Sequence, residues 1–126
     1  MYQHSAIRRQ ARAGAALLIA GCVFASAAFA HVFPQKQEPG AGATVASPAA
    51  VKITFDGPLE PAFSSLTVTD ATGKQVNTAK ATVDAHEPAV ITVPLPTLST
   101  GHYTVHWVAV ASDGHRTHGD YPFDVK

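Results

Sequence analysis

Residues 101–111 read Gly-His-Tyr-Thr-Val-His-Trp-Val-Ala-Val-Ala and give the strongest secondary-structure signal in the 126-residue chain. Tyr103, Val105 and Trp107 recur at every second position, so an extended backbone places them on one face. Alternation of this kind predicts a half-buried β-strand whose apolar face belongs to a protein core. The next four residues, Ser112-Asp113-Gly114-His115, are polar and predict a break after the strand.

Shorter stretches on both sides of this strand show the same extended pattern. The clearest are 51–55 and 121–125, in which apolar and polar residues alternate. In chain order, the expected strands are 31–33, 51–55, 66–69, a weaker one within 74–83, 89–93, 101–111 and 121–125. Segments rich in Pro and Gly, such as 34–49, separate several of them, and nothing after residue 30 keeps the 3.6-residue period of a helix.

Short strands spaced about ten residues apart, with no helix between them, predict an all-β fold. We expect an immunoglobulin-like Greek-key β-sandwich or barrel of about seven strands. Its common core should contain the aromatic residues of the last two expected strands, which are Tyr103, Trp107, Tyr121 and Phe123.

Residues 1–30 have the pattern of a cleavable signal peptide. Arg8, Arg9 and Arg12 precede an apolar run, and Ala28-Phe29-Ala30 is a small-x-small cleavage site. The mature chain is therefore expected to begin at His31, after export. The alternative is lipoprotein processing at Cys22, but the apolar residues that follow it favour cleavage after Ala30.

The composition of residues 31–126 narrows the function. These 96 residues suffice for one small domain, and they carry six basic and nine acidic residues, a net charge of −3. Nothing in this balance indicates a nucleic-acid partner. Cys22 and Met1 are the only sulfur-containing residues and both precede residue 31, so the mature domain has neither disulfides nor sulfur ligands.

Asp113 and His115 are the first candidate metal ligands. Two residues apart in an extended backbone, they point to the same side with Cα atoms about 6–7 Å apart. A mature amino-terminal His31 would add an α-amine and an imidazole, for a set of three nitrogens and one oxygen. Such a set suits Cu(II) best, with Zn(II) as the alternative, whereas Cu(I) and blue-copper sites call for sulfur ligands.

Other polar residues are weaker candidates. His118 could be a further ligand or a partner of one, although the same spacing also occurs by chance on exposed loops. Asp56 and Glu60 could place an acid near the metal, but we do not expect either to be a ligand. His86, His102 and His106 are expected to be ordinary surface histidines, with His106 facing solvent opposite Trp107.

The chain also resembles the CopC family of bacterial periplasmic copper-binding proteins. The resemblance rests on His31 after the cleavage site, on the 39–41 turn, on 51–58, on the motif from Gly101 through Ser112-Asp113-Gly114-His115, and on 119–125. It implies a cupredoxin-like β-sandwich with one Cu(II) per chain held by His31, Asp113 and His115. It also implies a role in copper handling in the periplasm, often beside the inner-membrane protein CopD, and we expect the protein to be a monomer. The Met-rich segment of some members has no counterpart here, which indicates the Cu(II)-only subgroup.

Three functions follow as hypotheses. The first is copper capture for carriage, sequestration or resistance, which is binding and not enzyme turnover. The second is a copper-dependent oxidative enzyme with a histidine brace, which Asp113 disfavours because an equatorial carboxylate would make the copper harder to reduce. The third is a metal-free immunoglobulin-like interaction module. Binding through the amine and both imidazoles requires their deprotonated forms, so copper affinity should fall at acidic pH.

Overall fold

A computed structural model describes residue 21 and residues 31–126, so the expected signal peptide, apart from residue 21, lies outside the described residues. These residues form two four-stranded sheets and contain no helix. The strands are β1 (Pro34–Glu38), β2 (Thr44–Val45), β3 (Ala50–Phe55), β4 (Ser65–Asp70), β5 (Thr82–Val83), β6 (Val90–Pro94), β7 (Gly101–Val110) and β8 (Arg116–Val125). The predicted β-sandwich is thereby confirmed, with eight strands where about seven were expected.

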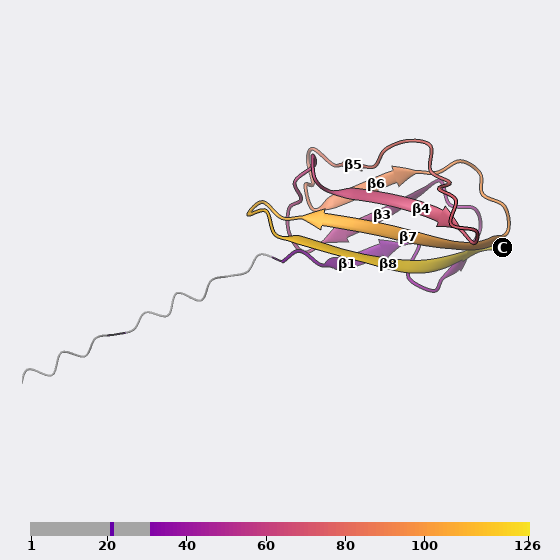
Figure 1. Cartoon of the computed structure of the whole chain (residues 1–126), viewed down its shortest axis with the longest axis horizontal. Coiled ribbons are helices and arrows are strands. Elements are labelled where there is room, and N and C mark those ends of the chain that lie inside the picture. Colours follow the sequence, from indigo (N-terminus) through magenta and orange to yellow (C-terminus); the bar gives the residue numbers. More distant parts are fainter. Residues whose placement is uncertain (1–20, 22–30) are drawn as a thin grey trace, which may run out of the picture.

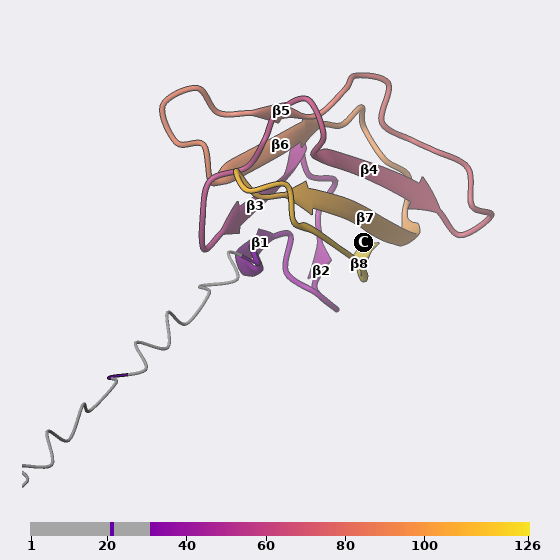
Figure 2. The same cartoon turned by 60° about the vertical axis from the view of Figure 1, so that its left-hand side comes forward.

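The two sheets face each other across the core (Figures 1 and 2). One has the strand order β1-β3-β6-β5 and the other the order β2-β8-β7-β4. All neighbouring strands are antiparallel except β2 and β8, which are parallel. No helix long and apolar enough to cross a membrane occurs in the part of the chain that the structure describes.

The core contains the inward faces of both sheets. Tyr103, Trp107, Tyr121 and Phe123 are all buried in it, as the alternation predicts. The ring of Trp107 meets Phe55 of the opposite sheet edge-on, with centroids 5.4 Å apart, and the ring of Tyr103 stacks on Phe123 at 5.5 Å. These contacts across and within the sheets fix the β7–β8 hairpin against the rest of the domain.

Two expected strands are wrong in position. Residues 31–33 are not a strand, and the first strand instead covers 34–38, inside the Pro- and Gly-rich segment 34–49 in which no strand was expected. Pro34 fits there because β1 is the edge strand of its sheet, where a missing N–H is tolerated. Within 74–83, only Thr82 and Val83 form a strand, since most of this segment loops past the sheet. The two-residue β2 was not predicted.

β7 and β8 are the two central strands of their sheet, and the turn of the hairpin that they form lies at one end of the sandwich. The ten-residue strands stay in register from Gly101 opposite Val125 to Val110 opposite Arg116. The turn of this hairpin and the beginning of β1 lie at the same end, on the left in Figure 1. Residues that are more than eighty positions apart in the sequence therefore meet there.

Candidate metal centre

A tight turn closes the β7–β8 hairpin and carries two of the candidate ligands. The backbone N–H of Ala111 donates to the carbonyl oxygen of His115, and the N–H of Gly114 donates to that of Ala111; each nitrogen–oxygen distance is 2.9 Å. Gly114 has φ +88°, a left-handed conformation that residues with a Cβ rarely adopt. The glycine thus permits the reversal that places Asp113 and His115 at the tip of the hairpin.

Asp113 and His115 are bonded to each other through both backbone and side chain. Asp113 Oδ1 accepts the backbone N–H of His115 at 3.0 Å, and Oδ2 accepts the imidazole Nδ1–H at 2.7 Å. The backbone N–H first, and then the imidazole, hold the pKa of the Asp113 carboxyl below its usual range. With the proton on Nδ1, the lone pair of the ring lies on Nε2, the usual arrangement of a histidine oriented by a carboxylate.

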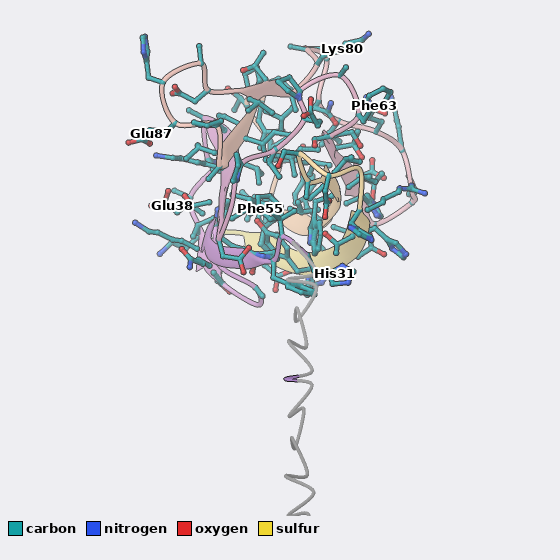
Figure 3. The ribbon with its side chains drawn as sticks, turned by 90° about the vertical axis from the view of Figure 1, so that its left-hand side faces the viewer. His31, Glu38, Phe55, Phe63, Lys80 and Glu87 are labelled. Carbon is teal, nitrogen blue, oxygen red and sulfur yellow. The ribbon has the colours of Figure 1, made fainter. Side chains whose placement is uncertain are left out.

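His31 lies beside this pair, as the sequence predicts for a site built from both ends of the domain. Its ring centroid is 5.2 Å from that of His115 and 6.2 Å from that of Phe33. Figure 3 looks onto this end of the sandwich, where His31 lies on the side opposite Phe63 and Lys80. The structure therefore brings His31, Asp113 and His115 to one place.

The three side chains do not yet surround a common point. Within residues 31–126 and at residue 21, no three His, Cys, Asp or Glu side chains are arranged around one metal position. Nδ1 of His115 bonds Asp113, and the backbone nitrogen of His31 is a peptide amide in the full chain. Cleavage before His31 would convert that amide into an amine, a new nitrogen donor.

A small cavity adjoins the site. It has a volume of about 160 Å³ and is lined by His31, Asp56 and Ser112 together with the neighbouring apolar residues. A larger depression of about 500 Å³ lies between β4 and the 75–81 loop, but no His, Asp, Glu or Cys lines it. Cavity size alone therefore does not mark the place where metal-binding chemistry is available.

The other histidines lie on strand surfaces and in a loop. His106 is on the outer face of β7, opposite Trp107 as expected, and its Nδ1 donates to Asp120 at 2.7 Å. His102 forms a second cross-strand pair with Asp124, and His86 is exposed in a loop. His118 is exposed on β8, in register with Val108, so its role as a further ligand stays untested.

Two residues near the site were not recognised for the contacts they make. Asp56 Oδ1 accepts the backbone N–H of Phe33 at 2.8 Å, and the hydroxyl of Thr117 donates to the carbonyl of Val32 at 2.7 Å. Asp56 was expected only to lie near the metal, and Thr117 was not singled out. No local pattern marks either contact, because the partners are 23 and 85 positions apart.

Known proteins are similar to this chain in sequence, and solved structures among them are similar in fold. Residues 35–126 match the family model described as the CopC domain. The crystal structure of CopC from Methylosinus trichosporium OB3b is 40% identical with a TM-score of 0.72, covering 76% of this chain and 94% of that one. PcoC, a methionine-rich copper resistance protein from Escherichia coli, is 31% identical with a TM-score of 0.69, covering 77% and 100%. Copper resistance protein C of Xanthomonas campestris pv. juglandis is 34% identical over 116 residues, covering 87% and 91%.

The two-sheet fold and these matches together define a class, that of copper resistance proteins built on a β-sandwich. Within this class the chain belongs to the CopC family, whose domain it carries over residues 35–126. The resemblance inferred from the sequence motifs is confirmed.

Proposed function

We propose that this protein captures one Cu(II) ion per chain in the periplasm through His31, Asp113 and His115. Once residues 1–30 are removed, His31 contributes its amine and its imidazole, His115 an imidazole nitrogen and Asp113 a carboxylate oxygen. The protein binds copper as a monomer and does not turn over a substrate. It then stores the ion or passes it to a membrane partner such as CopD.

The observation that carries this proposal is the meeting of His31 with His115. The ring centroids are 5.2 Å apart although the residues are 84 positions apart in the sequence, and the Asp113 carboxylate contacts His115 directly. Nitrogen and oxygen donors of this kind favour Cu(II) among the divalent ions. Membership of the CopC family supports copper over zinc as the natural ion.

Cu(II) is favoured over Cu(I) by what the mature domain lacks. Residues 31–126 contain neither Cys nor Met, and a Cu(I) site normally uses such soft sulfur ligands. The relative PcoC is described as methionine-rich, so this chain differs from it in composition. We therefore assign a single Cu(II) site and no separate Cu(I) site.

The test is a spectroscopic Cu(II) titration, in competition with a chelator, of the mature protein that begins at His31. A matched protein with one glycine added before His31 retains every side chain but lacks the amine at the correct position. We expect the added residue to weaken Cu(II) binding by about a hundredfold or more, because it removes a direct ligand and the chelate ring it closes.

Equal affinity of the two proteins would refute the amine ligand. Loss of copper from both during dialysis against the chelator would instead favour a metal-free interaction module. Mass spectrometry of the exported protein provides the companion measurement, since a mature form that begins at His31 is required and a lipidated Cys22 would exclude it.

A further inference from the structure

The segment before β1 is held in place although it is not part of a strand. The hydroxyl of Thr117 donates to the carbonyl oxygen of Val32 at a distance of 2.7 Å. Asp56 bonds Phe33 twice: its Oδ1 accepts the backbone N–H at 2.8 Å, and its own backbone N–H donates to the carbonyl at 3.0 Å. We refer to these contacts of Thr117 and Asp56 with residues 32 and 33 as the amino-terminal clamp.

The side chain of Val32 adds a second, apolar attachment. It is 3% exposed and packs in the core cluster, whereas its neighbours His31 and Phe33 are exposed. Gly57 leaves room for it, because a Cβ at residue 57 would lie 3.1 Å from Val32 Cγ1. The chain is therefore fixed immediately after His31, which would be the first residue of the proposed mature protein.

Thr117 connects the two halves of the candidate site. It lies on β8, two residues after His115, while Val32 directly follows His31. β8 and β1 belong to different sheets, so the hydroxyl of Thr117 joins β8 to the segment that leads into β1 of the other sheet. His31 is bonded to Val32, Val32 accepts the Thr117 hydroxyl, and Thr117 is two residues from His115. This short connection fixes the position of His31 relative to that of His115.

We propose that Thr117 and Asp56 are positioning residues that hold His31 beside His115 before copper binds, an inference that rests on the proposed function. The first residues of a domain are usually poorly ordered unless something ties them down. A ligand on such a segment would have to be ordered during binding, and that cost would weaken the affinity. The clamp meets the cost in advance, during folding of the domain.

The central experiment replaces Thr117 by valine, which keeps the shape of the side chain and removes the hydroxyl. Loss of one hydrogen bond that orders the ligand should weaken Cu(II) binding by about fivefold to tenfold. Thr117→Ser keeps the hydroxyl and should restore most of the affinity. At saturation the Cu(II) electron paramagnetic resonance spectrum should match that of the wild type, because the ligands are unchanged.

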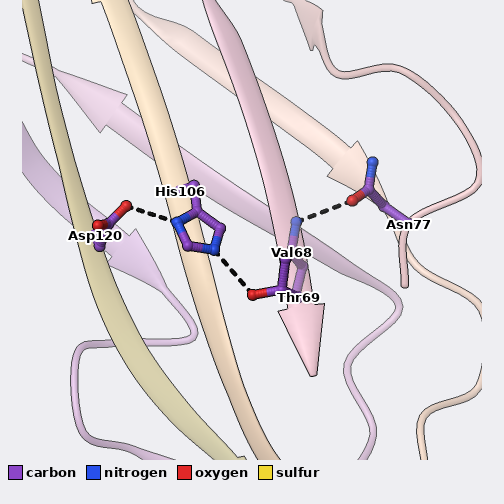
Figure 4. Close-up of polar contacts among 5 residues, drawn as sticks. All are labelled: Val68, Thr69, Asn77, His106 and Asp120. Atoms are coloured by element: carbon purple, nitrogen blue, oxygen red, sulfur yellow. Dashed lines mark hydrogen bonds and ion pairs between the residues drawn. The ribbon is translucent and has the colours of Figure 1, made fainter. Parts of the chain in front are cut away.

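Thr69 provides the matched control. Its hydroxyl donates to His106 Nε2 at 2.8 Å on the outer face of the sheet (Figure 4). Thr69→Val removes a hydrogen bond of similar length but should leave Cu(II) affinity unchanged. Amide hydrogen exchange of metal-free protein gives a second readout, since Thr117→Val should speed exchange at the Phe33 N–H and Thr69→Val should not.

The outcomes separate the clamp from the proposed function. If wild-type protein fails to bind Cu(II), or binds equally well with a residue added before His31, the proposed function fails. If wild type binds as proposed but Thr117→Val and Thr69→Val have equal affinities, the clamp is refuted. Should Thr117→Val fail to fold, Asp56→Ala and Asp56→Asn form the test, because only Asn keeps an oxygen that accepts the Phe33 N–H. Weaker binding by Asp56→Ala alone supports the clamp, and equal affinities overturn it.

Discussion

Two aspartate–histidine pairs on the β7–β8 hairpin have the same nitrogen–oxygen distance and different surroundings. The imidazole Nδ1 of His115 is 2.7 Å from the carboxylate of Asp113, and that of His106 is 2.7 Å from the carboxylate of Asp120. Both imidazole side chains are partly exposed, at 46% and 40%. The difference lies beyond the pair, where His115 meets the ring of His31 and His106 accepts the hydroxyl of Thr69.

The comparison shows that an aspartate–histidine pair is not enough to define a metal site. At His106, the carboxylate and the hydroxyl together satisfy both ring nitrogens, and the pair becomes a cross-strand contact on the sheet surface. At His115, the neighbour is a second imidazole on a segment that cleavage would convert into a chain terminus. The added nitrogen donors, and not the pair, distinguish the candidate site.

The largest expected effect is on copper binding when the two histidines are exchanged for alanine separately. His115→Ala should weaken Cu(II) binding by about a hundredfold or more, because it removes a direct ligand. His106→Ala removes the equivalent pair and should leave the affinity within about twofold of wild type, as expected for a solvent-exposed contact. Competitive titration of both mature variants measures this, and a similar loss in both would mean that the two pairs do not differ in the proposed way.

Gly119 tests whether the hairpin between the two pairs can be weakened without touching a ligand. A Cβ at this position would lie 2.7 Å from Trp107 Cζ2 and 2.8 Å from Cε2, so the substitution overpacks the core. Gly119→Ala should lower the free energy of unfolding by about 2 kcal/mol. For a domain of this size, that corresponds to a Tm about 8–16 °C lower.

The matched control for that variant is Gly40→Ala. A Cβ at residue 40 would meet its nearest neighbour at 3.8 Å, an ordinary contact, so the Tm should hardly change. Thermal unfolding followed by circular dichroism compares the two. Cu(II) affinity measured well below the Tm should stay near wild type for both, and a large loss in folded Gly119→Ala would show that packing along the hairpin controls the metal end.

The sequence predicts most of the fold because its longest strands alternate clearly. Residues 101–111 and 121–125 identify both the hairpin and the aromatic core, and the structure confirms them. The prediction is wrong near the amino terminus, since a proline usually marks a turn, yet Pro34 lies at the beginning of an edge strand. Edge position is a property of the assembled sheet and cannot be read from local residues.

In the candidate site, too, some residues could be predicted from the sequence and others could not. His31, Asp113 and His115 could be proposed as ligands from the sequence because their donor atoms and positions carry a chemical meaning. Thr117 and Asp56 could not be assigned their contacts, because hydrogen bonds to the backbone of residues 32 and 33 depend on how the two sheets meet. Residues that carry chemistry are therefore easier to predict from sequence than residues that hold them in place.

The smallest expected effect concerns Asp70, which closes the turn after β4 much as Asp113 closes the turn after β7. Its Oδ1 accepts the hydroxyl of Thr72 at 2.6 Å and the backbone N–H groups of Thr72 and Lys74, and the Thr72 hydroxyl is the main cause that lowers the pKa of Asp70. A carboxyl with a lowered folded-state pKa stabilises the protein above its unfolded value of about 3.9, and this contribution is lost as pH falls through the folded-state pKa. Asp70→Asn should therefore be less stable than wild type in urea unfolding at pH 7 and pH 5, with a difference that shrinks below about pH 4.

Thr72→Val should show a weaker form of the same pH dependence, and neither variant should change Cu(II) affinity. A stability difference that stays constant from pH 7 to pH 3 would mean that Asp70 acts through its shape and not its charge, and a change in copper affinity would mean that the two turns are not independent.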